Sequence, residues 1–167
     1  GRITTPVPEP VGTGSIDDKV RDAVSMLADL HFPATGKAGD RLQAMGVRGN
    51  VYLTGCPSID LCAKVRYDPV LTTRLTLVLQ HPVTGEDAAA QIDETIAAIE
   101  MVHPEHVIWF WPGEDAGCAA IAKRLRLWHL TNPPNVEFKR HFPPEKFLDL
   151  LANAECLVGN SSAGIRE

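Results

Sequence analysis

The sequence predicts an α/β protein with Rossmann-like parallel sheets, and two observations carry this prediction. From residue 75 onward, short apolar runs of strand length alternate with segments whose apolar residues recur at helical spacing. The run Leu75–Leu79 is almost continuously apolar, which is typical of a strand covered by helices on both faces. Repeated alternation of strand and helix produces a parallel sheet with right-handed crossover connections.

The first sixty residues are expected to show the same alternation. A helix is predicted at 17–30, because its apolar residues are three or four apart and Ser15 can cap its start. A short strand at 31–34, a helix around 39–45 and a strand at 50–54 should follow, with the sequence GCPSID forming a turn. The proline-rich opening is expected to be an extended loop.

The elements of the second half follow a polar, irregular bridge at 61–74. Strands are expected at 75–79, 107–111, 136–138 and 156–158, and helices at 86–102, 115–128 and 144–153. We therefore predict a first unit at 1–60, a linker at 61–74 and a second unit at 75–167.

The composition of the chain argues against several kinds of binding partner and against a membrane-spanning protein. A net charge of −5 and a pI near 5.7 argue against nucleic-acid partners and against an anionic membrane surface. No apolar run reaches the length of a membrane span. Cys56, Cys62, Cys118 and Cys156 form no CxxC pair and are expected to be buried free thiols in a reducing cytoplasm. The proline-rich start, and an end at Glu167 inside a motif, suggest a fragment.

Ligands of open α/β sheets bind at the carboxyl ends of the strands. The most unusual local sequences fall at these positions: QHPVTGE, WPGEDAG, KRHFPPE and GNSSAGIRE. In the last of them, Ser161 and Ser162 can donate hydrogen bonds to a diphosphate, and Glu167 can accept from ribose hydroxyls. An ordinary helix cap explains the same residues equally well.

Two further positions can carry chemistry. His81 follows a strand and is fixed by Pro82, so it can bind a phosphate or donate a proton to it, although a lone histidine is more often structural. Asp17 and Arg21 are one helical turn apart and can act as an acid or base with a steering arginine. Their spacing alone favours a surface ion pair.

Other notable side chains have simpler interpretations. Trp109 and Trp111 alternate in a strand and should pack, with Trp111 near enough to the following loop to form a pocket wall. His103 and His106 are three residues apart near the end of a predicted helix, which resembles metal-ligand spacing only superficially, so they should be solvated and no metal is assigned.

Together, several motifs resemble those of the hydrolysing UDP-N-acetylglucosamine 2-epimerases, including the epimerase half of the bifunctional animal enzyme. They are GTGSIDDKVRDAVSMLADLHF, TGCPSID, LQHPVTGE, WPGEDAG and GNSSAGIRE, in that order, and the resemblance covers 14–167. It implies a glycosyltransferase-B-like fold with two Rossmann-like domains. This chain would then be the carboxyl-terminal part of the first domain and an incomplete nucleotide-binding second domain.

The resemblance also implies site residues and chemistry. His81, Ser161 and Ser162 match diphosphate binders, and Glu167 matches the ribose-binding carboxylate. Phe142 matches a position that contacts uracil. Asp17 and Arg21 match a catalytic carboxylate and its arginine, and the other family acids would precede Gly1. The implied reaction eliminates UDP from UDP-N-acetylglucosamine, or a related UDP-sugar, and hydrates the glycal to N-acetylmannosamine for sialic-acid synthesis. It needs neither metal nor nicotinamide, and the complete protein is expected to be a homo-oligomer.

This sequence also departs from the family. Asp22, Met26 and Asp29 stand where the family commonly has histidine, lysine and histidine, and Gly113 replaces an asparagine near the base pocket. A diacetylated bacillosamine sugar is therefore an alternative substrate. A glycosyltransferase of the same fold, or a truncated nucleotide-binding module without activity, remains an alternative function.

Overall fold

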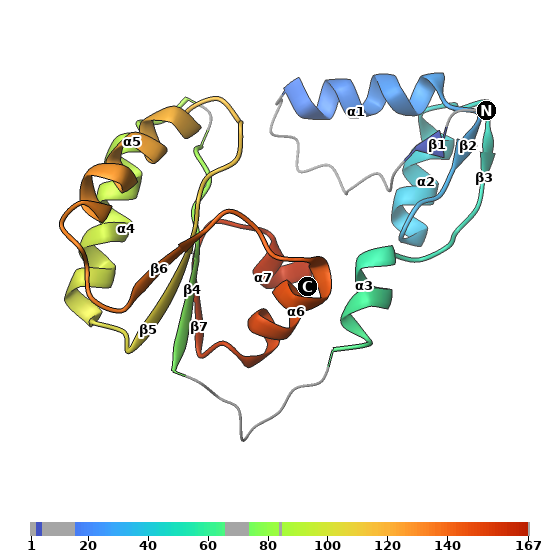
Figure 1. Ribbon diagram of the computed structural model, residues 1–167. Helices are drawn as coiled ribbons and strands as arrows, with labels where there is room; N and C mark the ends of the chain where they lie inside the picture. The colour runs from blue at the N-terminus through green and yellow to red at the C-terminus, as the bar shows by residue number, and fades with distance from the viewer. Residues whose placement is uncertain (1–2, 5–15, 66–73, 84, 167) are drawn as a thin grey trace. The chain divides into compact units, whose positions relative to one another are not determined.

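The computed structural model describes residues 3–4, 16–65, 74–83 and 85–166 (Figure 1). The chain divides into two compact units, Gly1–Asp60 and Leu61–Glu167. Each unit holds its own sheet, and every strand pairing described in either sheet is parallel. This confirms the predicted α/β class with parallel sheets. No helix in the described ranges is both long enough and apolar enough to cross a membrane.

The first unit has a three-stranded sheet in the order β1-β2-β3. Its elements are β1 (Ile3–Thr4), α1 (Ile16–Leu27), β2 (Leu30–His31), α2 (Gly36–Ala44), β3 (Asn50–Val51) and α3 (Pro57–Cys62), which runs two residues past the unit boundary. Thr35 caps α2 by accepting a hydrogen bond from the Ala38 N–H. Asp22 of α1 forms an ion pair with Arg41 of α2, with a closest N–O distance of 2.8 Å.

Three sequence-based expectations for the first unit are wrong. The first helix ends at Leu27 and not at residue 30, because Leu30 pairs with Ile3 and Asn50 in the sheet. The expected turn at 55–60 contains the start of α3, where Pro57 occupies the first helical position that tolerates proline. The opening stretch contains β1, a two-residue edge strand whose pairing no local pattern signals.

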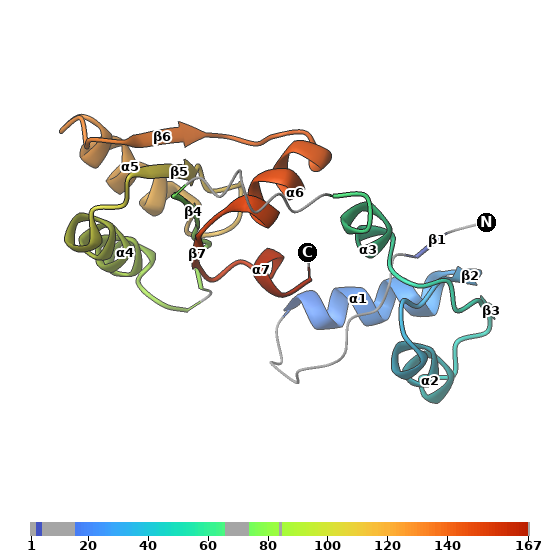
Figure 2. The ribbon, with the colours of Figure 1, turned by 90° about the horizontal axis from the view of Figure 1, so that it is seen from below.

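The second unit alternates strand and helix as predicted, with boundaries shifted by up to three residues. Its elements are β4 (Leu75–Leu79), α4 (Ala88–Val102), β5 (His106–Phe110), α5 (Cys118–His129), β6 (Val136–Lys139), α6 (Pro144–Asn153), β7 (Cys156–Gly159) and α7 (Ala163–Arg166). The strand order is β6-β5-β4-β7, as the turned view in Figure 2 shows.

Helices cover both faces of this sheet (Figure 1). Alternate strand residues point to opposite sides, so Val78, Val107 and Trp109 pack with α4 and α5, whereas Leu77 and Ile108 belong to the core on the α6 side. Trp109 is fully buried, as its place in the strand predicts, and its ring meets Trp128 edge to face at 5.1 Å between centroids. The loops that follow the carboxyl ends of the strands are thus attached to a sheet that is packed on both faces.

Candidate functional site

The strand order places a topological switch point between β4 and β7. The chain adds β5 and β6 on one side of β4 and then crosses to add β7 on the other side. The loops that follow the carboxyl ends of β4 and β7 therefore run in opposite directions. Open α/β sheets bind their ligands in the crevice between such loops. His81 follows β4, and Ser161 and Ser162 follow β7, so the fold brings three of the predicted site residues to one edge of the sheet.

The side chain of Asn160 joins the two loops. The His81 N–H donates to Asn160 Oδ1 at 2.8 Å, and Asn160 Nδ2 donates to the His81 carbonyl at 2.9 Å. Sequence reasoning did not single out Asn160, although it lies inside the GNSSAGIRE motif. The available signal was the position of an asparagine between a glycine at the end of a strand and two serines. This signal does not identify the partner of Asn160, because His81 is 79 residues away in the chain.

Gly159 makes this approach possible. The last pair of the β4–β7 ladder joins Leu79 to Gly159, and Gly159 has a φ of +132°. A Cβ atom at this position would lie 1.9 Å from the Leu79 carbonyl oxygen. The backbone turns away here, and only a residue without a side chain fits so close to the neighbouring strand.

The two serines differ in exposure and bonding. Ser161 is half-buried and its Oγ accepts a hydrogen bond from the Ala163 N–H at 3.3 Å, so Ser161 acts as the helix cap that the alternative interpretation predicts. Its hydroxyl proton remains a donor for an anion, because only the oxygen is used by the cap. Ser162 is exposed. Glu167, the third residue predicted in this motif, lies outside the described residues.

His81 presents an exposed side chain on a restrained backbone. Asn160 holds its main-chain groups, and Pro82 follows directly. Pro82 in turn lies against Gly117, where a Cβ atom would come within 2.8 Å of the Pro82 Cβ. The loop after β4 is therefore fixed from both sides while the imidazole stays accessible.

A large hollow of about 1,200 Å³ opens beside the carboxyl ends of β5 and β6. Trp111 and Gly113 line it, which agrees with the expectation that Trp111 forms a pocket wall, and Arg140 contributes a cation. Phe142 does not line this hollow. It packs edge to face on Phe110 at 5.8 Å between ring centroids, on the α6 side of the sheet.

Asp17 and Arg21 belong to α1 of the first unit. Arg21 forms an ion pair with Asp18, with 3.1 Å between Nη1 and Oδ1, and the two residues are three apart on the helix. Asp17 lies in the first turn of α1, and its side chain is outside what the structure describes. The structure assigns Arg21 a carboxylate partner, and the predicted role of Asp17 stays a prediction.

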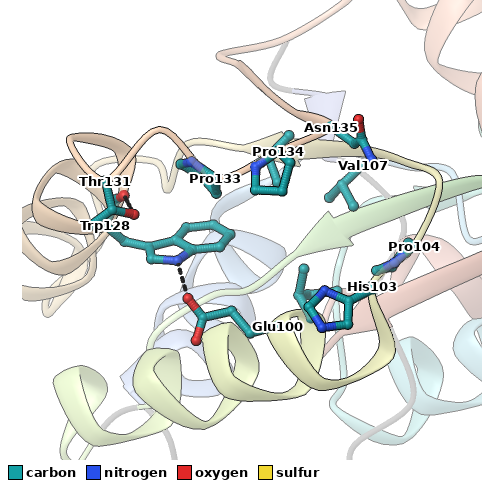
Figure 3. A pocket seen from close by; sticks show the side chains of 11 residues that line it. Glu100, His103, Pro104, Val107, Trp128, Thr131, Pro133, Pro134 and Asn135 are labelled. Carbon is teal, nitrogen blue, oxygen red and sulfur yellow. Dashed lines mark hydrogen bonds between the residues drawn. The ribbon is translucent and has the colours of Figure 1, made fainter.

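The opposite edge of the second unit holds a separate pocket of about 410 Å³ (Figure 3). Its wall includes His103 and Trp128, whose indole Nε1 donates to Glu100 Oε1 at 2.7 Å. No predicted ligand-binding or catalytic residue lines this pocket. His106 lies 4.0 Å from Glu137, and no group of three metal-ligating side chains gathers anywhere in the described ranges.

The cysteines do not all follow the expected burial. Cys118 is buried at the start of α5, and burial raises the pKa of its thiol. Cys56 and Cys62 are partly exposed and Cys156 is exposed, so the prediction of buried thiols is wrong for Cys156. Cys156 opens β7, which pairs with β4 on one side only among the described strands, and this edge position leaves the thiol accessible.

Comparison with known proteins identifies the family to which this chain belongs. The chain matches the family model for UDP-N-acetylglucosamine 2-epimerase over residues 11–167. The UDP-N-acetylglucosamine 2-epimerase of Neisseria meningitidis is 31% identical over 173 residues, covering 93% of this chain and 43% of that protein. The UDP-N,N'-diacetylbacillosamine 2-epimerase (hydrolyzing) of Legionella pneumophila is 27% identical over 169 residues, covering 93% of this chain and 44% of that protein.

A crystal structure from Listeria monocytogenes, provisionally assigned as a UDP-N-acetylglucosamine 2-epimerase, superposes with a TM-score of 0.61 at 17% identity. The match covers 92% of this chain and 42% of that chain, and it agrees with the predicted glycosyltransferase-B-like fold. This chain thus spans less than half the length of the relatives it matches. Since the family model covers nearly all of it, the chain belongs to the UDP-N-acetylglucosamine 2-epimerase family.

Proposed function

We propose that this chain forms part of a hydrolysing UDP-N-acetylglucosamine 2-epimerase and that its second unit binds the UDP of the substrate. The observation that carries the proposal is the convergence of His81 with Ser161 and Ser162 at the β4–β7 switch point. Two hydroxyl donors and an accessible imidazole suit a diphosphate, because each can donate a hydrogen bond to a charged oxygen.

The remaining predicted residues would complete the nucleotide site. Glu167 follows the serine turn and would accept hydrogen bonds from the ribose hydroxyls. Phe142 after β6 would contact the uracil, and Gly113 after β5 would lie near the base. In this arrangement the base lies towards β5 and β6, and the diphosphate lies at β4 and β7.

The proposed reaction has two steps. In the first, the bond between carbon 1 of the sugar and the UDP oxygen breaks, and a base removes the proton from carbon 2, which leaves a glycal. In the second, water adds its hydroxyl to carbon 1 and a proton returns to carbon 2 from the opposite face. The products are UDP and N-acetylmannosamine, and both steps need positioned acids and bases.

Asp17 is the carboxylate of this chain that we propose for proton transfer. It lies in the first turn of α1, one helical turn before Arg21. Arg21 would steer the anionic substrate. Because His81 faces the diphosphate in this proposal, it would stabilise the charge on the leaving UDP or donate a proton to it.

A diacetylated bacillosamine sugar is the second candidate substrate. The Legionella relative and a Campylobacter jejuni relative, 23% identical over 167 residues, are both named as hydrolysing diacetylbacillosamine 2-epimerases. A different sugar or base preference would arise at the positions that depart from the usual epimerase residues, which are Asp22, Met26, Asp29 and Gly113.

The test is product analysis of the complete protein. Given UDP-N-acetylglucosamine, it should release UDP together with N-acetylmannosamine, and the diacetylated UDP-sugar should be assayed in parallel. Sugar transfer to an acceptor without inversion at carbon 2 would indicate a glycosyltransferase, and absence of any product would indicate a binding module. The 167-residue chain alone should bind UDP without turning over substrate.

Titration calorimetry on this chain tests the nucleotide site directly. The double variant Ser161→Ala, Ser162→Ala should lose about 1.5–3 kcal/mol of UDP binding free energy for each hydrogen bond to the charged diphosphate. Ser58→Ala, in α3, is the matched control and should bind UDP as the unmodified chain does. Unchanged affinity in the double variant would remove both serines from the site.

A further inference from the structure

We propose that Asn160 is a positioning residue that fixes His81 for its contact with the substrate diphosphate; this inference rests on the proposed function. Asn160 makes two hydrogen bonds with the main chain of one residue, accepting from the His81 N–H at 2.8 Å and donating to the His81 carbonyl at 2.9 Å. The carboxamide thereby pairs with His81 as a strand residue would.

These two hydrogen bonds take the place of a main-chain pair between the two strands. The β4–β7 ladder ends at the pair Leu79 and Gly159, and Gly159 turns the backbone away with a φ of +132°. Because of this turn, the main-chain pairing between the two segments does not continue past Leu79 and Gly159. The Asn160 side chain instead forms hydrogen bonds with His81, which lies two residues beyond the end of β4. Beyond the ladder, the described hydrogen bonds between the two diverging loops are therefore those of this one side chain.

The position of the imidazole depends on this connection. The His81 side chain is exposed, and within the described ranges the hydrogen bonds of His81 are made by its main chain and not by its ring. What restrains the residue is its main chain, bound by Asn160 and followed by Pro82, which packs against Gly117. A ring on a fixed main chain loses less conformational freedom when it binds an anion.

Asn160 also has no competing task in the described structure. Both of its polar atoms are used by His81, and Ser161 rather than Asn160 caps the following turn. Removing the carboxamide should therefore act on anion binding through His81 and leave the cap intact.

A double-mutant cycle on the 167-residue chain tests this dependence, with UDP and inorganic pyrophosphate as titrants. Asn160→Ala and His81→Ala should each weaken UDP binding by about tenfold, the lower end of the effect of one lost hydrogen bond to a charged group. If Asn160 acts through His81, the double variant should also lose about tenfold. Independent contributions would multiply to about a hundredfold and would overturn the proposal.

Two further measurements separate positioning from general damage. Amide hydrogen exchange of the His81 N–H, measured without ligand, should be slow in the unmodified chain and faster in Asn160→Ala; unchanged exchange would overturn the proposal. Asn160→Asp keeps the size of the side chain but places a carboxylate oxygen against the His81 carbonyl, so it should bind UDP as weakly as Asn160→Ala. Binding at the unmodified level would contradict the proposed pairing.

Asn153→Ala is the matched control, since it removes an asparagine that also donates to a main-chain carbonyl, that of Asp149 within α6. Its UDP affinity and His81 exchange should equal those of the unmodified chain, and a tenfold loss there would show that the effect is not specific to the switch point. If the unmodified chain binds neither UDP nor pyrophosphate, the proposed function fails together with this inference. If it binds both but the cycle is multiplicative, only the role of Asn160 fails.

Discussion

Replacement of Gly159 by alanine should destabilise the second unit severely. A Cβ atom there would lie 1.9 Å from the Leu79 carbonyl oxygen and 2.6 Å from the Leu79 carbonyl carbon, so the contact is with main chain and not with a flexible side chain. Relief requires β4 and β7 to separate at their carboxyl ends, because neither strand has a rotamer to change. Overpacking of this kind typically costs about 1–3 kcal/mol.

The backbone conformation adds a second cost. Gly159 has a φ of +132°, a region that alanine rarely adopts, and such strain costs roughly 1–3 kcal/mol. The two costs together give about 2–6 kcal/mol, which is a large part of the roughly 5–15 kcal/mol that stabilises an ordinary domain. The variant should therefore unfold at much lower denaturant concentration, if it folds at all.

Tryptophan fluorescence during urea unfolding measures this effect in the second unit alone, since Trp109, Trp111 and Trp128 all lie in that unit. Gly85→Ala is the matched control. Gly85 has a φ of +88° and no atom within 4 Å of an added Cβ, so that variant carries the backbone strain without the clash. If Gly159→Ala is no less stable than Gly85→Ala, the close approach of β7 to β4 is not the reason for this glycine.

Two further predictions concern a pair of thiols and the proposed catalytic carboxylate. Cys156 should react with iodoacetamide near pH 8, whereas Cys118 should not, because burial raises the pKa of the Cys118 thiol and keeps it protonated. Mass spectrometry of the labelled chain measures the labelling of each cysteine, and equal labelling of the two would contradict this prediction. Asp17→Asn in the complete protein should lower kcat by about 10²–10⁴ with UDP affinity unchanged, whereas near-normal turnover would leave Asp17 outside the mechanism.

The sequence alone predicted much of the second unit. The apolar run Leu75–Leu79 and the helical spacing that follows gave the correct type for each of the seven elements from β4 to β7. These signals are local, since a strand covered on both faces must be apolar and a helix must repeat its apolar residues every three or four positions. The family resemblance, which rests on motifs in the first helix and at the ends of strands, also followed from the sequence.

The first unit was less predictable from its sequence. Its three strands are two residues each, which is too short for an alternating pattern, and Leu30 fits the apolar spacing of the preceding helix as well as a strand. Pairing with Ile3 and Asn50 decides in favour of the strand. These contacts join distant segments, so no local rule places the end of α1 at Leu27.

At the candidate site, the sequence determined which loops carry unusual residues, and the tertiary structure decided which of those loops meet. Chain order does not reveal that β7 crosses to the free side of β4, and this crossing places Ser161 and Ser162 beside His81 rather than beside β6. It also brings Asn160 to a main-chain partner 79 residues away. The side-chain pattern of each segment reflects whether that segment is buried, and it does not identify the neighbouring segment. Contacts between segments so far apart in the chain can therefore be recognised only from the assembled sheet.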